Sequence, residues 1–380
     1  MFTILLTLIF ARPFISSLAF PYLNYIYSYL LLLFVISWCI VRKVSLSKTN
    51  RLLYPLAAFF LSLIISGIFS HDRIGFLKEA YKYIAGPLIL LVAGSCNKKE
   101  KDIILQTLLF AGLTISILAI YQYFFGFRNL LDYLKRENIN NAFVMDYIAR
   151  RRVFFPFVTP NALGGYLAMI IPLILIFKNR VFLSMPILIA IFLSGSLGAI
   201  SSLALAIIIY LCLESGCDKK ILIYPLGLLI ILGLVFISRS TPQKPHLQPA
   251  FSAVMRLDYW TETLGIIKLH PWTGIGIGNF NLEHSRYAHN SYLQLWAETG
   301  ILGLLSLIWL VIAIFKKSLN GLRGKTDIVN AGLIISSSVF IIHNFIDFGF
   351  FLPEVASIWW LILGLMSVTS DGNQTAATVL

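Results

Sequence analysis

The apolar runs of the chain constrain its fold more than any other feature. About twelve of them, each of roughly 15 to 25 residues, follow one another with short connections, at about 2–19, 26–41, 52–69, 75–95, 103–125, 160–177, 181–195, 197–213, 221–238, 291–315, 328–346 and 354–369. A helix of about 20 residues crosses a bilayer, and in lipid its backbone groups are satisfied internally. Charged residues make up only 12% of the chain. The sequence therefore predicts an all-α, polytopic integral membrane protein with about 12 transmembrane helices in a single transmembrane domain, 1–380.

The distribution of basic residues predicts the orientation of this domain. Lysine and arginine gather in the short connections 42–51, 98–101, 178–180, 219–220 and 316–325, which the positive-inside rule assigns to the cytoplasm together with both chain ends. The net charge of +13 then reflects topology rather than nucleic-acid binding. The first apolar run has no small-residue cleavage site after it and is expected to stay as a helix. The four cysteines lie near cytoplasmic ends, which argues against disulfides and against a cysteine metal site.

Two connections, 126–159 and 239–289, are longer than a simple link requires and are expected in the periplasm. The predicted periplasmic side carries more arginine than lysine, and the cytoplasmic side the reverse. Arginine suits forked contacts with phosphate oxygens, so an anionic substrate handled on the outer side explains the bias. The second loop predicts a short amphipathic, interfacial helix at 250–269, with apolar residues at Val254, Leu257, Trp260, Leu264 and Ile267. The thin break at 194–196 predicts tilted or re-entrant helices on either side of it.

Residues 271–303 combine glycines, basic residues and the start of an apolar helix. Gly274, Gly276 and Gly278 predict either a tight turn or a set of amides that face an anion. His289 and Asn290 stand where the helix begins, and Ser291 with Gln294 fits a capping box. The helix dipole there favours a neutral, proton-accepting imidazole. His289 is thus either a catalytic base or a polar residue at headgroup level.

Other polar residues near predicted helix ends offer similar alternatives. Arg152, at the end of an arginine triplet, precedes Pro160 and Asn161, a pair typical of a helix start in which Asn161 is the cap. Arg152 and Arg256 are each either ligand-binding residues or headgroup contacts. His343 and Asp347, one turn apart, either brace a site or clamp two helices. The histidines and acids lack metal-ligand spacing, so no metal and no cofactor are expected.

Three patterns in the chain resemble the bacterial O-antigen ligase and polymerase superfamily. They are Arg-x-x-x-Pro-Phe-x-x-Pro-Asn at 152–161, Arg256-x-x-x-Trp260, and Pro-x-x-Gly-x-Gly-x-x-Asn-Phe followed by His-Asn-x-x-Leu-Gln-x-x-x-Glu-x-Gly within 271–303. The resemblance implies a GT-C-type glycosyltransferase of the bacterial inner membrane with its site facing the periplasm. It implies transfer of a glycan from undecaprenyl pyrophosphate to the lipid A–core oligosaccharide, with inversion. It also implies that the site is built from residues at matching positions: His289 as base, Arg152 and Arg256 as pyrophosphate ligands, and Asn161, Gly276, Asn290, Glu298, His343 and Asp347 as support.

The resemblance leaves other functions open. An O-antigen polymerase joins the same kind of donors to each other, and a protein O-oligosaccharyltransferase uses a protein acceptor. A transporter of a lipid-linked anion is an alternative from another class, but it would place arginines inside its spans. Here only Arg12 lies within a predicted span, so an enzyme is the favoured interpretation.

Overall fold

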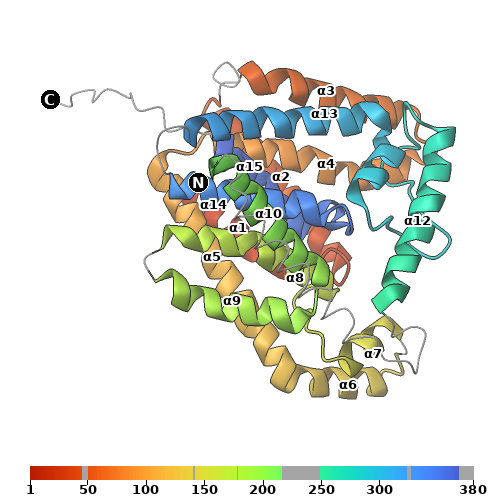
Figure 1. Cartoon of the computed structure of the whole chain (residues 1–380). Helices are drawn as coiled ribbons and strands as arrows, with labels where there is room; N and C mark the ends of the chain where they lie inside the picture. The colour runs from red at the N-terminus through yellow and green to blue at the C-terminus, as the bar shows by residue number, and fades with distance from the viewer. Residues whose placement is uncertain (45–49, 140–141, 178, 216–248, 323–326, 368–380) are drawn as a thin grey trace.

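The computed structural model describes the chain except residues 45–49, 140–141, 178, 216–248, 323–326 and 368–380 (Figure 1). The described residues form helices and connections with no strand, which confirms the all-α prediction. The α-helices are α1 (Phe2–Ala11), α2 (Pro21–Val41), α3 (Asn50–Ile68), α4 (Arg73–Gly94), α5 (Lys98–Tyr121), α6 (Phe127–Arg136), α7 (Ala142–Ala149), α8 (Pro160–Ile170), α9 (Arg180–Ser194), α10 (Leu197–Ser215), α12 (Pro249–Leu269), α13 (Ser291–Leu322), α14 (Ile328–His343) and α15 (Pro353–Ser367). Short 3₁₀ turns, η1 (Arg12–Phe14), η4 (Ile171–Ile176) and η7 (Gly349–Phe351), extend or precede some of them.

Three stretches in the described part are long and apolar enough to cross a bilayer: Pro21–Val41, Lys98–Arg136 and Ser291–Asn320. Shorter apolar helices cover seven more of the predicted runs, at Phe2–Phe14, Leu52–Ile68, Pro160–Ile176, Arg180–Ser194, Leu197–Leu213, Ile328–His343 and Pro353–Ser367. The predicted run 221–238 lies outside the described residues. These helices fit a transmembrane protein, and the total of twelve spans stays a prediction.

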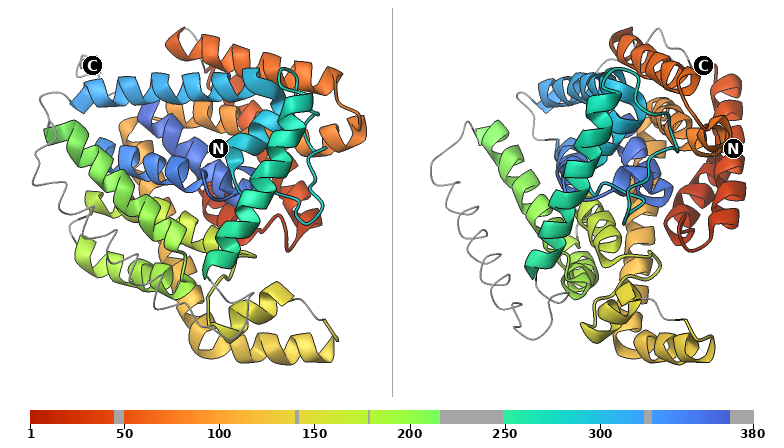
Figure 2. Two further views of the ribbon diagram at one scale, coloured as in Figure 1. Left: turned by 45° about the vertical axis from the view of Figure 1, so that its right-hand side comes forward. Right: turned by 90° about the vertical axis from the view of Figure 1, so that its right-hand side faces the viewer.

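Helix α15 occupies the core of the bundle, because nearly all its residues are buried. It packs along α4, while α3 lies beside α13 and α10 beside α14 (Figure 1). Helix α12 does not run with these helices. It lies across one end of the bundle, at the right of Figure 1, and both views of Figure 2 show it crossing α13. This crossing end carries the candidate site described below.

Arg12 ties the beginning of the chain to the C-terminal core. Its Nη2 donates to Asn24 Oδ1 at 2.7 Å and lies 3.7 Å from Glu354 Oε2, and its Nη1 donates to the Ile15 carbonyl. Asn24 in turn donates to the Tyr81 hydroxyl at 2.8 Å. A buried charge is tolerated when it is paired and hydrogen-bonded in this way. Arg12 therefore joins helices and does not mark a path through them.

The break predicted at 194–196 is present. Gly195 ends α9 in the left-handed region at φ +61°, which glycine adopts without a Cβ clash. Helix α10 begins two residues later, so α9 and α10 are separate short helices.

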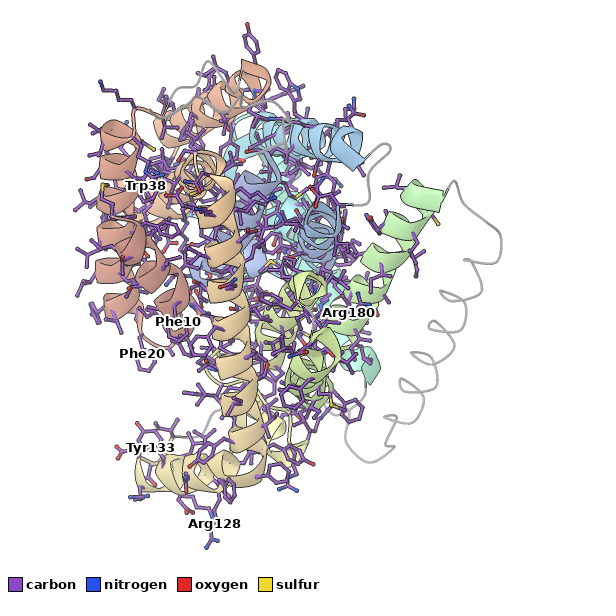
Figure 3. All side chains as sticks on the ribbon, turned by 90° about the vertical axis from the view of Figure 1, so that its left-hand side faces the viewer. Phe10, Phe20, Trp38, Arg128, Tyr133 and Arg180 are labelled. Carbon is purple, nitrogen blue, oxygen red and sulfur yellow. The ribbon has the colours of Figure 1, made fainter. Side chains whose placement is uncertain are left out.

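The loop 126–159 contains two helices that the sequence analysis missed. A single π-helical turn, η3 (Gln122–Gly126), joins α5 to α6, and α7 follows. Helix α6 buries Phe127 and Leu134 and exposes its charged face. Figure 3 shows Arg128 and Tyr133 on α6, at the foot of α5, where α6 leaves the bundle. The apolar residues Phe127, Leu130, Leu131 and Leu134 recur at helical spacing with charged residues between them, and this spacing was the signal available in the sequence.

Candidate functional site

His289 lies in the loop just before α13, and its neighbours fix it there. Its backbone has φ +51°, a left-handed conformation that is uncommon for residues other than glycine. Asn290 is the cap of α13, because its Oδ1 accepts from the amides of Tyr292 and Leu293, both at 3.1 Å. The predicted capping box of Ser291 and Gln294 is therefore wrong. Ser291 is itself the first helical residue and its hydroxyl donates to Asn344 Oδ1, so Asn290 takes the cap one position earlier.

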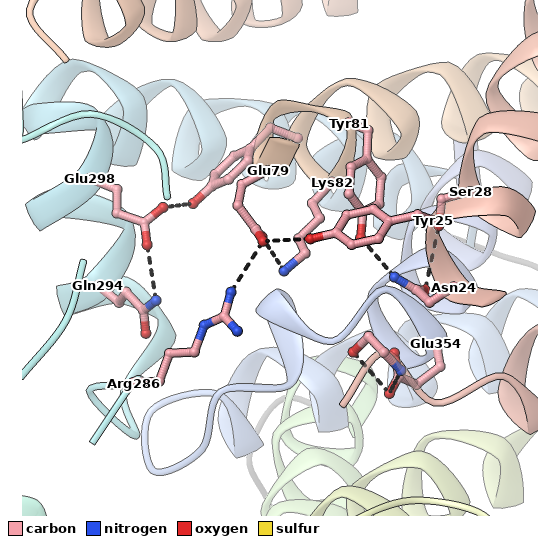
Figure 4. Close-up of polar contacts among 12 residues, drawn as sticks. Asn24, Tyr25, Ser28, Glu79, Tyr81, Lys82, Arg286, Gln294, Glu298 and Glu354 are labelled. Atoms are coloured by element: carbon pink, nitrogen blue, oxygen red, sulfur yellow. Dashed lines mark hydrogen bonds and ion pairs between the residues drawn. The ribbon is translucent and has the colours of Figure 1, made fainter. Parts of the chain in front are cut away.

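Gln294 does not form the predicted cap. It supports the loop that carries Arg286 and His289, here called the histidine loop. Its Oε1 accepts from the Ala288 amide at 3.2 Å, and its Nε2 donates to Glu298 Oε1 at 3.0 Å. Glu298 Oε2 accepts from the Tyr83 hydroxyl of α4. Figure 4 shows the contact between Gln294 and Glu298. The residue next to His289 is thereby tied to α4 through a buried network, and such networks hold their members in one arrangement.

Two aromatic rings enclose the His289 imidazole. The Tyr259 ring of α12 stacks on it at 5.6 Å between centroids, and the Phe348 ring meets it edge-on at 4.8 Å. Burial lowers the pKa of His289 to about 4; Asp347 opposes the shift and Arg256 adds to it. The imidazole is neutral at neutral pH, as predicted. The cation that acts on His289 is Arg256, whereas Arg286 pairs with Glu79.

Arg256 comes to the site from α12. Its Nη1 donates to Ser252 Oγ at 3.0 Å, while its buried Nε has no hydrogen-bond partner. The charge of Arg256 acts on both His289 and His343. The predicted helix is present at Pro249–Leu269, but its apolar face was assigned incompletely. Ile267 is buried, whereas Val254, Leu257 and Leu264 point outward, because Tyr259 and Thr263 occupy the side that packs on the bundle.

His343 and Asp347 form a buried pair beside His289. His343 Nδ1 lies 3.7 Å from Asp347 Oδ2, and the charge of Asp347 reaches both histidines. A Cβ at Gly165 would lie 2.7 Å from the His343 ring, so the glycine of α8 lets the two helices approach. The same segment also joins α14 to α13: the carbonyl and Oδ1 of Asn344 accept from the Ser291 amide and hydroxyl at 2.9 and 2.6 Å, and the Asp347 carbonyl accepts from that hydroxyl at 3.1 Å.

Arg152 is held against α8 and the end of α9. Its Nε donates to the Ser194 carbonyl at 2.9 Å, and its Nη2 donates to Asn161 Oδ1 at 3.0 Å. Asn161 is not the cap of α8 as predicted. Thr159 is the cap, with its Oγ1 accepting from the Ala162 amide, so Asn161 is left to bind Arg152. Pro160 takes the first position of α8, whereas a cap at Asn161 would have placed it before the helix.

The charges of Arg152 and Asp347 meet at Tyr147 of α7. Both act on the Tyr147 hydroxyl, whose pKa is raised mainly by burial. The Arg152 guanidinium also lies 5.9 Å from the centre of the Tyr147 ring. Tyr147 therefore connects the Arg152 side of the site to the Asp347 side. Tyr147 was not predicted as a site residue, because α7 was not predicted from the sequence.

The glycine-rich turn shapes the site and leaves no anion cradle at its first two glycines. The amides of Gly274 and Gly276 donate to the carbonyls of His270 and Glu298, both at 3.1 Å, so the alternative of anion-facing amides is wrong for these two residues. Gly276 has φ +96°, and a Cβ there would lie 2.5 Å from Ser70 Oγ. The turn fits into a break in α13 at Gly300, where φ is +71°. A Cβ at Gly300 would meet the Trp272 carbonyl at 1.9 Å, so this close approach requires glycine.

Three of the buried polar atoms without a partner belong to His289 and to two residues whose charges act on it. Among the described residues, the buried side-chain atoms that lack a hydrogen-bond partner are Tyr166 Oη, Arg256 Nε, Trp260 Nε1, His289 Nδ1, Asp347 Oδ2 and Glu354 Oε2. Arg256, His289 and Asp347 interact electrostatically, and Trp260 follows Arg256 by one helical turn. Buried polar groups are nearly always satisfied, so a group of open donors and acceptors indicates a place where a ligand or water completes them.

The arrangement so far defines a helical membrane protein with a basic site that contains a neutral histidine under a crossing helix. Comparison with known proteins agrees with this class. The family model described as O-antigen ligase matches residues 181–308, a range that includes Arg256, His289 and Glu298. The chain is also 26% identical to an O-antigen ligase of Salmonella typhimurium over 330 residues, which cover 75% of each protein.

Both matches show that the chain is similar to O-antigen ligases. This similarity supports a role in lipopolysaccharide assembly and a glycosyl-transferring activity. Arg152, His343 and Asp347 lie outside the range of the family match. Their association with the site rests on the geometry given above.

Proposed function

We propose that this protein is an O-antigen ligase that transfers a glycan from undecaprenyl pyrophosphate to the lipid A–core oligosaccharide. The observation that carries the proposal is the neutral His289 beside Arg256, with open, buried polar atoms on both side chains. A neutral imidazole can accept a proton, and a guanidinium can bind phosphate oxygens in a fork. A sugar transfer from a pyrophosphate donor needs both functions at one place.

In the proposed reaction an acceptor hydroxyl attacks the anomeric carbon of the donor glycan. The new glycosidic bond forms as the bond from this carbon to the pyrophosphate oxygen breaks, and the configuration inverts. The hydroxyl proton passes to the His289 imidazole, and the electron pair of the broken bond leaves with undecaprenyl pyrophosphate. General-base assistance of this kind is worth about 10² to 10⁴ in rate.

Arg152 and Arg256 are proposed to bind the pyrophosphate and to stabilise the charge that develops as it leaves. Fixed cations aimed at developing charge commonly contribute about 10² to 10³ in rate. Arg256 brings an open Nε, whereas Arg152 is oriented by Asn161 and Ser194. The arginines are proposed to take the place that a metal ion occupies in other transferases.

Asp347 and His343 are proposed to support the base. The Asp347 charge raises the pKa of His289 against the effect of burial. It would stabilise the imidazolium that forms during transfer. Asn290, Gly276 and Glu298 hold the loop that carries His289, through the cap, the turn and the Gln294 contact.

The site is proposed to face the periplasm from the inner membrane, as the basic connections indicate. An alkaline phosphatase fusion at Asn138, which follows α6, is expected to be active. A fusion at Lys98, where α5 begins, is expected to be inactive. The reverse pattern would place the site in the cytoplasm and remove the proposed donor.

The direct test is transfer by the purified protein. The reaction would combine an undecaprenyl-pyrophosphate-linked glycan with lipid A–core and would be followed by the appearance of the longer glycolipid, with and without EDTA. Transfer that survives chelation supports the proposal. Loss of transfer that magnesium or manganese restores would overturn the arginine-based mechanism, and joining of donor glycans to each other would indicate a polymerase instead.

A further inference from the structure

A second basic group lies near His289 but outside the site described above. Lys82 of α4 and Arg286 of the histidine loop both contact the Glu79 carboxylate, with Arg286 Nη2 at 3.2 Å from Glu79 Oε1 and Lys82 Nζ on Oε2. The Tyr25 hydroxyl reaches the same carboxylate at 3.5 Å. Figure 4 shows Glu79 between Arg286, Lys82 and Tyr25. The three charged residues carry a net charge of one positive unit.

This group differs in depth from an ordinary surface ion pair. The side chains of Lys82 and Glu79 are only 12% and 13% exposed, while Arg286 is 61% exposed and forms the outer part of the group. Lys82 also lines a narrow cavity with Ser28 and Tyr81, between α2, α4 and α15. A nearly buried lysine beneath an exposed arginine gives an entering anion two contacts at different depths.

The group is connected to His289 through two stacked rings. The charges of Lys82, Arg286 and Glu79 all act on Tyr287. The Tyr287 ring stacks on Phe348 at 4.2 Å, and Phe348 contacts the His289 ring. Arg256 is reached from His289 by another route, through Tyr259 of α12. The histidine therefore has one basic group on each of two sides.

We infer that Lys82 and Arg286 bind a phosphate group of the acceptor glycolipid, with Glu79 occupying their donors until the acceptor arrives. The inference rests on the proposed transfer, because it places the acceptor on the Lys82 and Arg286 side of His289 and leaves the Arg256 side to the donor. A phosphate with nearly two negative charges and several acceptor oxygens competes well against one carboxylate for an ammonium and a guanidinium. The reacting hydroxyl would then lie beyond Tyr287 and Phe348, beside the imidazole.

Because Glu79 occupies these donors, the Glu79→Gln variant should have opposite effects under two alternative roles of the group. If the group binds phosphate, Glu79 is its competitor, and Glu79→Gln strengthens acceptor binding. If the three residues only fasten the histidine loop to α4, Glu79→Gln and Arg286→Ala both loosen the loop and both impair transfer.

The experiment measures initial rates for purified Lys82→Ala, Arg286→Ala and Glu79→Gln. The acceptor is the phosphorylated glycolipid or the same glycolipid after phosphatase treatment. Loss of charge-assisted contacts raises the KM for phosphorylated acceptor about tenfold or more in the two basic variants. Their KM for dephosphorylated acceptor and for donor stays unchanged, and Glu79→Gln lowers the KM for phosphorylated acceptor. Arg128→Ala, an exposed arginine of α6, is the matched control.

A binding measurement separates this inference from the proposed function. Binding of phosphorylated and dephosphorylated glycolipid to the detergent-solubilised variants is measured without donor, so it gives a result even if no transfer occurs. Equal weakening of both ligands, or damage by Glu79→Gln similar to that of Arg286→Ala, would overturn the inference. The transfer rate of each variant is also compared in phosphatidylglycerol and phosphatidylcholine vesicles. If the basic variants lose only the extra rate that phosphatidylglycerol gives the wild type, the group binds membrane lipid and the inference is overturned.

Discussion

Arg42 and Arg256 are both arginines at helix positions near an end of the bundle, and they differ in what fills their donors. Arg42, which follows α2, donates from Nη1 and Nη2 to both oxygens of Glu100 at 2.9 and 2.6 Å, and it lies over the Trp38 ring at 4.2 Å. Arg256 makes one side-chain hydrogen bond, to Ser252 Oγ, and has a buried Nε without a hydrogen-bond partner. An arginine that joins helices is satisfied within the chain. The open donor of Arg256 is the feature that a ligand can use.

The carboxylates show the same difference. Both oxygens of Glu100 accept from Arg42, whereas Asp347 accepts one bond, from the Phe348 amide, and its Oδ2 has no hydrogen-bond partner. Leaving a buried polar group open costs roughly 1 to 3 kcal/mol. A fold that keeps several such atoms together near one histidine gives up stability there, which is common at functional sites.

The largest effect is expected from replacing the histidine between the open groups. His289→Ala should abolish transfer, because no other group would take the acceptor proton. His289→Gln keeps a hydrogen-bonding side chain but cannot carry the proton away, so it should lose about 10² to 10⁴ in rate. The measurement is lipopolysaccharide ladder formation in a ligase-null strain, with the amount of each variant in the membrane checked by immunoblot. A full ladder from His289→Gln would mean that the residue only positions the acceptor.

The contrast between the two arginines predicts the next effect. Arg256→Lys should lower the transfer rate at least tenfold, because an ammonium does not replace a forked contact with pyrophosphate. Arg152→Lys should act in the same direction and would also lose the paired contacts to Asn161 and Ser194. Arg42→Lys is the matched control, and it should leave the rate per folded molecule unchanged while lowering thermal stability. Normal rates from both Arg256→Lys and Arg152→Lys would show that these arginines serve only the membrane interface.

Replacing Glu298, which supports the histidine loop through Gln294, should have a smaller effect, mainly on kcat. Glu298→Ala leaves Gln294 and Tyr83 without their shared partner, so the histidine loop should lose its fixed position and kcat should fall about tenfold. The KM for donor should change little, since the arginines are untouched. Glu298→Gln keeps one acceptor oxygen and should fall between the wild type and alanine. A rise in donor KM without a fall in kcat would refute the positioning role.

Much of the fold could be predicted from the sequence, because lipid imposes helical spans on apolar runs. The run 103–125 became most of α5, and 291–315 became the first part of α13. The kink at Gly300 was not predicted, because it depends on the Trp272 carbonyl that occupies the space of a side chain there. The helix caps were misassigned by one or two residues for a related reason. At each helix start several short polar side chains could accept the free backbone amides. Which of them does so depends on the backbone conformation, which the sequence does not show.

The candidate site could be predicted in composition but not in its connections. His289, Arg256 and Arg152 were each identified from local patterns, and the structure brings His343 and Asp347 beside His289. The contacts from Tyr83 to Glu298 and from Arg286 to Glu79 join residues more than 200 positions apart. No periodicity or motif encodes which helix packs beside which, so these partners required the tertiary structure.

The smallest expected effect is the response of the rate to mild acid, and it tests how far the environment of His289 departs from that of an exposed histidine. Burial lowers the pKa of His289 to about 4. The base works in its neutral form, so protonation lowers the rate only as the pH falls towards that value. Between pH 8 and 6 the neutral fraction should stay above roughly 0.95, and the kcat should be nearly flat. A histidine of ordinary pKa, near 6.5, would be only about one-quarter neutral at pH 6 and would lose about fourfold in rate.

Asp347→Asn should move the acid limb to still lower pH, because the Asp347 charge raises the pKa of His289. The measurement is kcat under saturating donor and acceptor from pH 4.5 to 8, with stability at each pH checked by incubation and return to pH 7. A fourfold fall by pH 6 would show that the imidazole is exposed to water during catalysis. Burial would then not lower the pKa of His289 in the working enzyme.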